Sequence, residues 1–185
     1  MKKNLHNHYK NITIYNLLTK FTFKNIFEIP KITKICLNIG FKDSNINKKK
    51  LINIILLLKL ITNQKPVITK SKKNNIFLKI KKNSVIGCKI TLRKMNIYIF
   101  LEKILIFILP NFKKLQINLK NKNILNFKIN NILDFFELNT EFLKFKNIPP
   151  IDVSIHTNVK TYNELFLLLN SLFIVKKNKL LAKIA

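Results

Sequence analysis

Two periodicities of apolar residues run along the chain, and together they predict a mixture of helices and strands. Apolar residues recur every three or four positions, as in amphipathic or buried helices, over 14–21, 48–61, 95–109 and 161–172. They alternate with polar residues, or form short apolar runs, as in strands, over 32–39, 66–70, 87–93, 120–130 and 151–157. Pro110 is expected to end the third helix, and Thr161-Tyr-Asn-Glu164 resembles a capping box at the start of the fourth.

The alternation assigns opposite faces to the residues of two strands. In the first strand, one face is predicted to carry Ile35, Leu37 and Ile39, and the other Cys36 and Asn38. In the strand over 87–93, one face is predicted to carry Cys88, Ile90 and Leu92, and the other Lys89, Thr91 and Arg93. The fold class expected is therefore α+β, with a single antiparallel-type sheet, helices packed on one face and a basic hairpin loop. The uncovered polar face would suit a nucleic acid.

Composition and charge narrow the class of partner. The chain has 185 residues with 35 Lys and Arg against 8 Asp and Glu, a formal net charge of +27, and 48% hydrophobic residues including 15 Phe. A packed domain with this positive field is not an ordinary neutral cytosolic enzyme and requires a polyanionic partner. Ile, Asn and Lys make up about half of the chain, with 31, 27 and 34 residues, whereas Gly occurs twice. These residues have A/T-rich codons, which indicates a gene of an organelle or a reduced endosymbiont.

We expect one domain over 1–185, with an N-terminal helix over 1–28, an α+β core over 29–175 and a basic tail over 176–185. The apolar runs 51–61 and 97–109 are interrupted by charge and are shorter than the ~20 residues that span a bilayer, so both are interpreted as buried helices. Cys36 and Cys88 match neither a metal spacing nor a disulfide framework, and they are interpreted as two buried thiols in a reducing compartment.

The sequence offers little to support catalysis. The three closest acids, Asp134, Glu137 and Glu141, are interpreted as solvated surface groups. The three histidines are too few and too scattered for a metal site, and there is no Gly-rich phosphate loop or nucleophile motif. We therefore expect no enzymatic activity, no metal and no cofactor.

The basic residues are more informative, because seven lysines surround one hairpin-like segment, here called the basic hairpin (65–82). They are Lys65, Lys70, Lys72, Lys73, Lys79, Lys81 and Lys82. A lysine run is commonly a solvated face, but this density in a chain already so positive favours contact with phosphates. Lysine contacts would position the protein, whereas Asn and Thr side chains on the sheet face would supply directional hydrogen bonds.

Three motifs resemble one known family in order and spacing. They are Ile-Pro-Lys-Ile-Thr-Lys-Ile-Cys-Leu-Asn-Ile-Gly (29–40), Asn-Gln-Lys-Pro-Val-Ile-Thr-Lys (63–70) and Ile-Gly-Cys-Lys-Ile-Thr-Leu-Arg (86–93). They are similar to the bacterial-type large-subunit ribosomal protein five family, over about nine-tenths of the chain. The resemblance implies an α+β protein of the central protuberance that binds 5S rRNA and large-subunit rRNA. It also implies a basic loop that reaches peptidyl-site tRNA, and contacts with neighbouring ribosomal proteins and the small-subunit head.

The resemblance also implies individual site residues. The polar RNA-binding positions expected are Asn38, Gln64, Lys65, Lys89, Thr91 and Arg93. The tRNA-facing loop expected is Lys70, Ser71, Lys72, Lys73, Asn74 and Asn75. Lys72 or Lys73 stands where the family has Arg, which keeps the charge of the loop but not the planar fork. Segment 121–147 lacks the Gly and Pro of the family pattern, and the family's contact with the small-subunit head partly involves this half.

Each site residue also has a purely structural interpretation. Asn38 can cap the strand end before Gly40, Gln64 can serve turn chemistry, and Thr91 is an ordinary strand residue. Arg93 is the only Arg beside 34 Lys, so the codon bias worked against it and a function is favoured. Phe77 is expected in the core or steadying the loop rather than stacking on a base, and His156 is expected to be a satisfied strand residue.

The sequence-based hypothesis is thus an rRNA-binding structural protein of an organellar large ribosomal subunit. A mitochondrial ribosome is favoured over a plastid or A/T-rich bacterial one, with 5S rRNA as a partner where it is present. The alternative is a basic membrane-surface or protein-interaction module that uses the same charge on anionic lipid or an acidic protein.

Overall fold

The computed structural model describes residues 4–41, 48–108, 118–121, 123–145 and 148–172. Its internal contacts divide the chain into two compact units. Unit 1 comprises Met1–Ile35, Arg93–Asn126 and Ile155–Ala185, and unit 2 comprises Cys36–Leu92 and Phe127–Ser154. The predicted helix end at Pro110 and the predicted basic tail over 176–185 lie outside the described residues. The single-domain boundaries stay a prediction.

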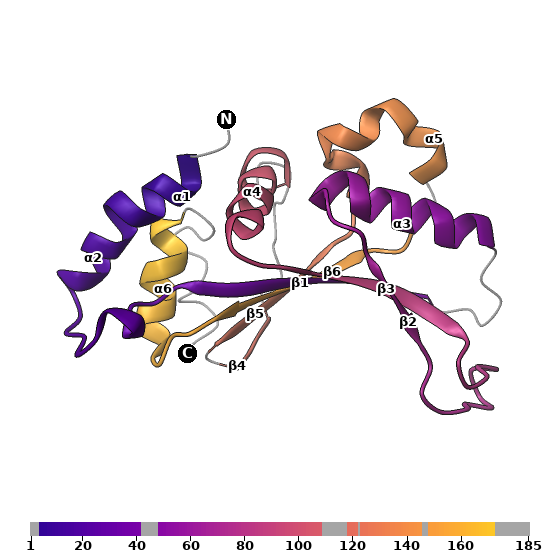
Figure 1. Cartoon of the computed structure of the whole chain (residues 1–185), viewed down its shortest axis with the longest axis horizontal. Helices are drawn as coiled ribbons and strands as arrows, with labels where there is room; N and C mark the ends of the chain where they lie inside the picture. The colour runs from indigo at the N-terminus through magenta and orange to yellow at the C-terminus, as the bar shows by residue number, and fades with distance from the viewer. Residues whose placement is uncertain (1–3, 42–47, 109–117, 122, 146–147, 173–185) are drawn as a thin grey trace. The chain divides into compact units, whose positions relative to one another are not determined.

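One six-stranded sheet has the strand order β2-β3-β1-β6-β5-β4 (Figure 1). Its strands are β1 (Ile32–Gly40), β2 (Val67–Lys70), β3 (Val85–Leu92), β4 (Asn118–Asn121), β5 (Ile124–Ile129) and β6 (Ile151–Thr157). The β2–β3 and β4–β5 pairs are antiparallel, and Val67 lies opposite Lys89 in the first of them. Sequence-adjacent strands that pair in this way, together with separate helices, confirm the predicted α+β fold.

In unit 2, the long helix α3 (Lys48–Thr62) packs against β3. Ile54, Leu57, Leu58 and Ile61 of this helix are fully buried, at the three- and four-residue spacing of one helix face. The short helix α5 (Phe142–Phe145) and the 3₁₀ segment η5 (Phe136–Glu141) also contact α3. Figure 1 shows α3 and α5 on the same side of the unit 2 strands, so the core of this unit lies between sheet and helices.

Gly87 of β3 allows two strand backbones to approach closely. A Cβ added there would collide with the carbonyl oxygen of Ile39 on β1 and would lie 3.2 Å from Oγ1 of Thr69 on β2. No such crowding surrounds Gly40, where an added Cβ would meet nothing within 4 Å. Close packing of the strands therefore requires a glycine at position 87, the second residue of the motif over 86–93.

Unit 1 begins with α1 (Asn4–His8), the π-helical turn η1 (Tyr9–Thr13) and α2 (Ile14–Leu18), which follow one another without a break in helical backbone. Helix α1 packs against α4 (Met95–Lys103), where the Leu5 amide donates to Glu102 Oε1 over 2.7 Å. The buried Tyr9 hydroxyl donates to the Pro30 carbonyl over 2.9 Å, and burial raises the pKa of Tyr9 to about 12.

The last helix of unit 1, α6 (Tyr162–Ser171), begins as predicted. Thr161 Oγ1 accepts a hydrogen bond from the Glu164 amide over 3.4 Å, and the Glu164 carboxylate accepts one from the Lys160 amide over 2.9 Å. The capping arrangement predicted for Thr161 and Glu164 is therefore confirmed. Helix α6 also contacts α2.

Several predicted boundaries were wrong. The helical periodicity predicted from residue 14 extends back to Asn4. The third helix, by contrast, follows its predicted range through α4 and the π-helical turn η3 (Ile104–Ile108) as far as it is described. Segment 120–130, predicted as one strand, contains parts of two strands, β4 and β5. Beyond β2, Ile80 pairs with Asn75 in an isolated bridge that closes a turn.

Candidate RNA interface

Unit 2 exposes a polar strand face opposite its core. On β1, Leu37 and Ile39 are fully buried while Asn38 between them is exposed. On β3, Cys88 and Ile90 are buried while Lys89 is exposed and Thr91 is half-buried. Because β1 and β3 are neighbours in the sheet, these exposed positions lie on adjacent strands. The predicted separation of apolar and polar residues between two faces is confirmed for both strands.

The prediction for the two cysteines was partly wrong. Cys88 is buried, and burial raises the pKa of its thiol, so it is held in the unreactive form. Cys36, however, is half-buried on the side of Asn38 rather than buried. The prediction of two buried thiols was therefore wrong for Cys36, because it lies on the side of β1 that carries the exposed Asn38 rather than the buried Leu37.

Gln64 and Lys65 follow the end of α3. Asn63 has a φ of 54°, a left-handed conformation that Asn tolerates well, and it turns the chain toward β2. The Gln64 Nε2 amide then donates to the backbone carbonyl of Thr91 over 3.3 Å. Two of the expected site residues are thus in direct contact, with the Lys65 side chain exposed beside them in the chain. Gln64 performs a structural task here, as the turn interpretation proposed.

Arg93 begins the second segment of unit 1, immediately after β3, and its side chain is exposed. The next residue, Lys94, has a φ of 53° and precedes α4. Arg93 continues the polar series of Lys89 and Thr91 by sequence alternation, and its guanidinium is open to a ligand.

Residues 71–84 connect β2 to β3 and are held together by their own polar groups. Backbone hydrogen bonds join the Ser71 amide to the Ser84 carbonyl over 2.9 Å and the Asn83 amide to the Ser71 carbonyl over 3.0 Å. The Ser71 hydroxyl is buried and donates to the Lys81 carbonyl. The side-chain oxygen of Asn74 accepts a hydrogen bond from the Lys82 amide over 2.6 Å, and that of Asn75 accepts one from the Leu78 amide over 3.2 Å.

The expected tRNA-facing loop therefore has two kinds of residue. Ser71, Asn74 and Asn75 use their side chains within the connection, so they shape it. The lysines are all exposed: Lys65, Lys70, Lys72, Lys73, Lys79, Lys81 and Lys82. The lysines, rather than the serine and asparagines, are the groups available for a phosphate backbone.

The tip of this connection is apolar. Ile76 is 89% exposed, Phe77 99% and Leu78 56%. The expectation that Phe77 lies in the core or steadies the loop was wrong, because the connection extends beyond the reach of the unit 2 core. Three apolar side chains among lysines are a feature that sequence periodicity did not reveal.

Other chemistry finds no support in the described parts of the chain. Those residues contain no group of three or more His, Cys, Asp or Glu side chains that could hold a metal ion. Within the same ranges, none of the helices has the length and apolarity needed to cross a membrane.

His156 is half-buried on β6. Burial, and then the nearby Lys34 charge, lower the pKa of its imidazole. The backbone carbonyl of His156 accepts a hydrogen bond from the Thr33 hydroxyl.

Comparison with known proteins defines the class. Residues 25–81 match the family model described as "Ribosomal protein L5", and residues 85–175 match the model described as "ribosomal L5P family C-terminus". The chain is thus a ribosomal protein of the large subunit, a structural class rather than an enzymatic one.

Relatives match over nearly the whole chain. A large ribosomal subunit protein uL5m from Reclinomonas americana is 36% identical over 179 residues, covering 95% of this chain and 98% of that protein. A large ribosomal subunit protein uL5 from Ehrlichia canis is 36% identical over 165 residues, covering 87% of this chain and 92% of that protein. A large ribosomal subunit protein uL5 from Nitrosomonas eutropha is 39% identical over 109 residues, covering 59% of this chain and 61% of that protein. The chain belongs to the uL5 family of large-subunit ribosomal proteins.

Proposed function

We propose that this protein anchors rRNA in the central protuberance of a mitochondrial large ribosomal subunit. Its partners there would be large-subunit rRNA, 5S rRNA where it is present, and neighbouring ribosomal proteins. A mitochondrial setting is supported by the similarity to the uL5m of R. americana, together with a composition biased toward Ile, Asn and Lys.

The observation that carries the proposal is the polar strand face of unit 2. Asn38 and Lys89 are exposed directly opposite buried apolar neighbours, so neither is needed for the core. An exposed amide and an exposed ammonium on rigid adjacent strands can bind an RNA backbone and base edges without further ordering. Thr91 adds a half-buried hydroxyl, while Gln64 acts through its bond to the Thr91 carbonyl. Arg93 adds a planar donor that favours phosphate.

The connection between β2 and β3 would reach peptidyl-site tRNA. Its exposed lysines can neutralise tRNA phosphates, and its internal hydrogen bonds limit the entropy lost on binding. Phe77, at 99% exposure, offers a ring face on which a base can stack. A contact with the small-subunit head is proposed from the family resemblance alone.

Ribosome sedimentation and chemical mapping test this proposal together. A tagged chain expressed in its own organelle should sediment with the large subunit, and ultraviolet cross-linking should join segment 89–93 to rRNA. Liposome flotation separates the membrane alternative, because a membrane-surface protein would float with anionic vesicles and leave the ribosomal fractions. Sedimentation away from the large subunit, or a cross-link map with rRNA absent from 89–93, would contradict the proposed interface.

A further inference from the structure

A short turn of unit 1 presents two large apolar side chains to solvent. This turn is the 3₁₀ segment η2 (Ile26–Glu28), which joins α2 to β1. Ile26 is 84% exposed and Phe27 is 85% exposed. Isolated apolar residues on a surface need no explanation by themselves. What distinguishes Phe27 is that hydrogen bonds hold its backbone and that the acid next to it is paired away from the ring.

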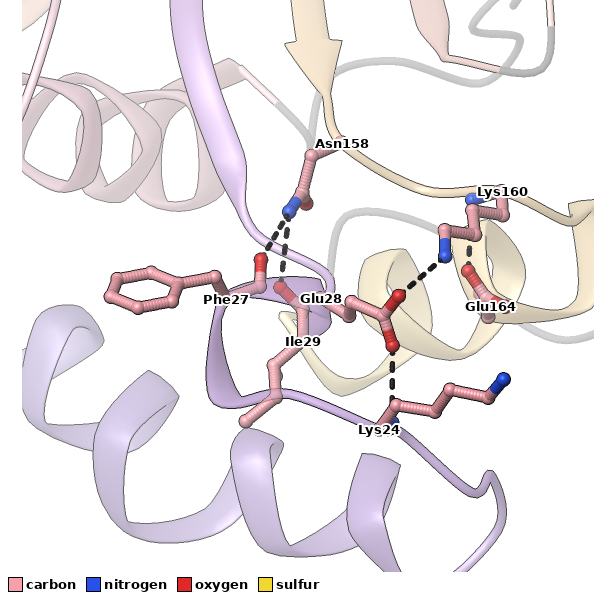
Figure 2. Close-up of polar contacts among 7 residues, drawn as sticks. All are labelled: Lys24, Phe27, Glu28, Ile29, Asn158, Lys160 and Glu164. Carbon is pink, nitrogen blue, oxygen red and sulfur yellow. Dashed lines mark hydrogen bonds and ion pairs between the residues drawn. The ribbon is translucent and has the colours of Figure 1, made fainter.

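One asparagine binds two backbone carbonyls, one within the turn and one just after it (Figure 2). The Asn158 Nδ2 amide donates to the Phe27 carbonyl over 3.5 Å and to the Ile29 carbonyl over 3.2 Å. Its Oδ1 accepts from the Lys31 amide over 2.6 Å, so the same side chain also fixes the start of β1. The backbone carrying Phe27 is therefore fixed before any partner arrives.

Glu28, the one acid of the turn, forms its hydrogen bonds on the side away from the Phe27 ring. Glu28 Oε1 accepts from Lys160 Nζ over 2.8 Å, and Oε2 accepts from the Lys24 amide over 3.1 Å. Figure 2 shows the Phe27 ring and the Glu28 carboxylate extending in opposite directions from the turn. The Glu28 charge is thus paired with Lys160, away from the ring, while the side chains of Lys20, Lys24 and Lys31 nearby in the chain are exposed.

We propose that Phe27 is a stacking platform for an unpaired base of the rRNA, an inference that rests on the proposed rRNA-binding function. An exposed aromatic ring on a hydrogen-bonded backbone, in a chain of net charge +27, has features of proteins that hold unstacked bases: a π face for the base and an overall positive field for the phosphates. A protein partner would require roughly 800 Å² of complementary surface, whereas one base requires a single ring face. Two exposed apolar side chains on a strongly basic chain fit the base better.

Cross-linking can locate the contact on the intact protein. Ultraviolet light joins stacked aromatic rings to bases, and trypsin would release Phe27 in the peptide 25–31, Asn-Ile-Phe-Glu-Ile-Pro-Lys, whose only aromatic residue is Phe27. We expect a nucleotide adduct on this peptide from irradiated ribosomes. The peptide 74–79, Asn-Asn-Ile-Phe-Leu-Lys, reports Phe77 of the basic hairpin independently.

Binding measurements separate stacking from a merely apolar contact. With protein-free large-subunit rRNA extracted from the same ribosomes, Phe27→Ala of the full chain should bind about 10-fold more weakly. Phe27→Tyr should bind like the original chain, while Phe27→Leu, apolar but not planar, should bind as weakly as Phe27→Ala. Phe136→Ala is the matched control, since Phe136 is 68% exposed but lies between Asp134 and Glu137. It should have no effect.

The two proposals fail in different ways. A missing adduct on peptide 25–31, or unchanged affinity of Phe27→Leu, would overturn the stacking platform even if segment 89–93 still cross-links to rRNA. A protein adduct in place of a nucleotide on that peptide would overturn it in favour of a protein contact. If the unmodified chain does not bind the rRNA and nothing cross-links, the proposed function itself falls, and the stacking inference with it.

Discussion

The side-chain amide of Gln64 donates a hydrogen bond to the backbone carbonyl of Thr91, 3.3 Å away, and so joins the end of helix α3 to strand β3. Both residues belong to the motifs that resemble the large-subunit ribosomal protein family. In this structure, the amide nitrogen of Gln64 faces the strand rather than a ligand. A residue expected to bind RNA thus helps to position β3, the strand proposed to bind RNA.

Replacing Gln64 should therefore affect stability as well as binding. Gln64→Ala removes the donor from a half-buried carbonyl and should lower the free energy of unfolding by about 1 kcal/mol. Urea unfolding of the full chain measures this loss. The matched control is Lys65→Ala, the exposed neighbour, which should weaken rRNA binding but leave stability within about 0.5 kcal/mol. Equal stability of Gln64→Ala and the original chain would show that the bond does not support the fold.

Arg93 should act on binding without affecting stability. Its side chain is exposed, and Arg93→Ala should weaken rRNA binding by about 1–3 kcal/mol, the range for charge-assisted hydrogen bonds. Arg93→Lys should recover only part of this loss, because a lysine keeps the charge but not the planar fork. Filter binding at constant salt measures both variants.

Lys94→Ala is the control for Arg93, since it removes one charge from the adjacent residue. Lys94 already has a positive φ with a side chain, so alanine adds no new backbone strain. We expect a smaller loss of affinity than for Arg93→Ala. Equal losses for the two variants would reduce Arg93 to one positive charge among many.

The lysines of the basic hairpin should be visible in the salt dependence of binding. Replacing Lys70, Lys72 and Lys73 by Ala should lower the slope of log affinity against log salt by roughly 2, if each contacts one phosphate. The matched variant replaces Lys49, Lys50 and Lys59 of α3, which are also exposed and carry the same total charge. Its slope should change less. If both triple variants change the slope equally, the hairpin has no special place in the interface.

The strand faces could be predicted from the sequence because the pleat of a strand alternates side chains with a fixed period of two. Leu37 and Asn38, or Cys88 and Lys89, were therefore assigned to opposite faces correctly. The fold class followed from the order of helical and strand-like segments.

Other features depend on distances that no local pattern encodes. An N-terminal helix was predicted, but its periodicity was recognised only from residue 14, because the buried Leu5 and Tyr9 are separated by the polar segment 6–8. Phe77 was misplaced because its burial depends on whether the connection between β2 and β3 folds back on the core. No sequence pattern indicated that Phe27 would be exposed, because the path of its backbone depends on the hydrogen bonds that Asn158 makes from a distant part of the chain.

Substitution by alanine should destabilise the fold at Gly87 but leave its stability unchanged at Gly40. At Gly87, the new methyl group of Gly87→Ala would collide with the backbone carbonyl of Ile39, which cannot move without separating β1 from β3. We expect a loss of about 2 kcal/mol in the free energy of unfolding. Gly40→Ala meets nothing within 4 Å, and neither glycine has a positive φ, so its stability should stay within about 0.5 kcal/mol. Urea unfolding of both variants checks the contrast.

The ion pair of Glu28 with Lys160 should make part of the stability of unit 1 depend on pH. The hydrogen bond from Lys160, followed by the Lys24 amide, lowers the pKa of the Glu28 carboxyl below its ordinary value of 4.5. A carboxylate whose pKa falls on folding contributes stability above the unfolded pKa and loses it as pH falls through the folded pKa. Glu28→Gln should therefore be less stable than the original chain at neutral pH, and the difference should shrink as pH falls below the ordinary carboxyl pKa of 4.5. Asp152→Asn serves as control, because its pair with Lys128 is longer, 3.5 Å, and more exposed. Urea unfolding at pH 7 and pH 3 measures the effect, and a deficit of Glu28→Gln that is the same at both pH values would rule out the ion pair as its cause.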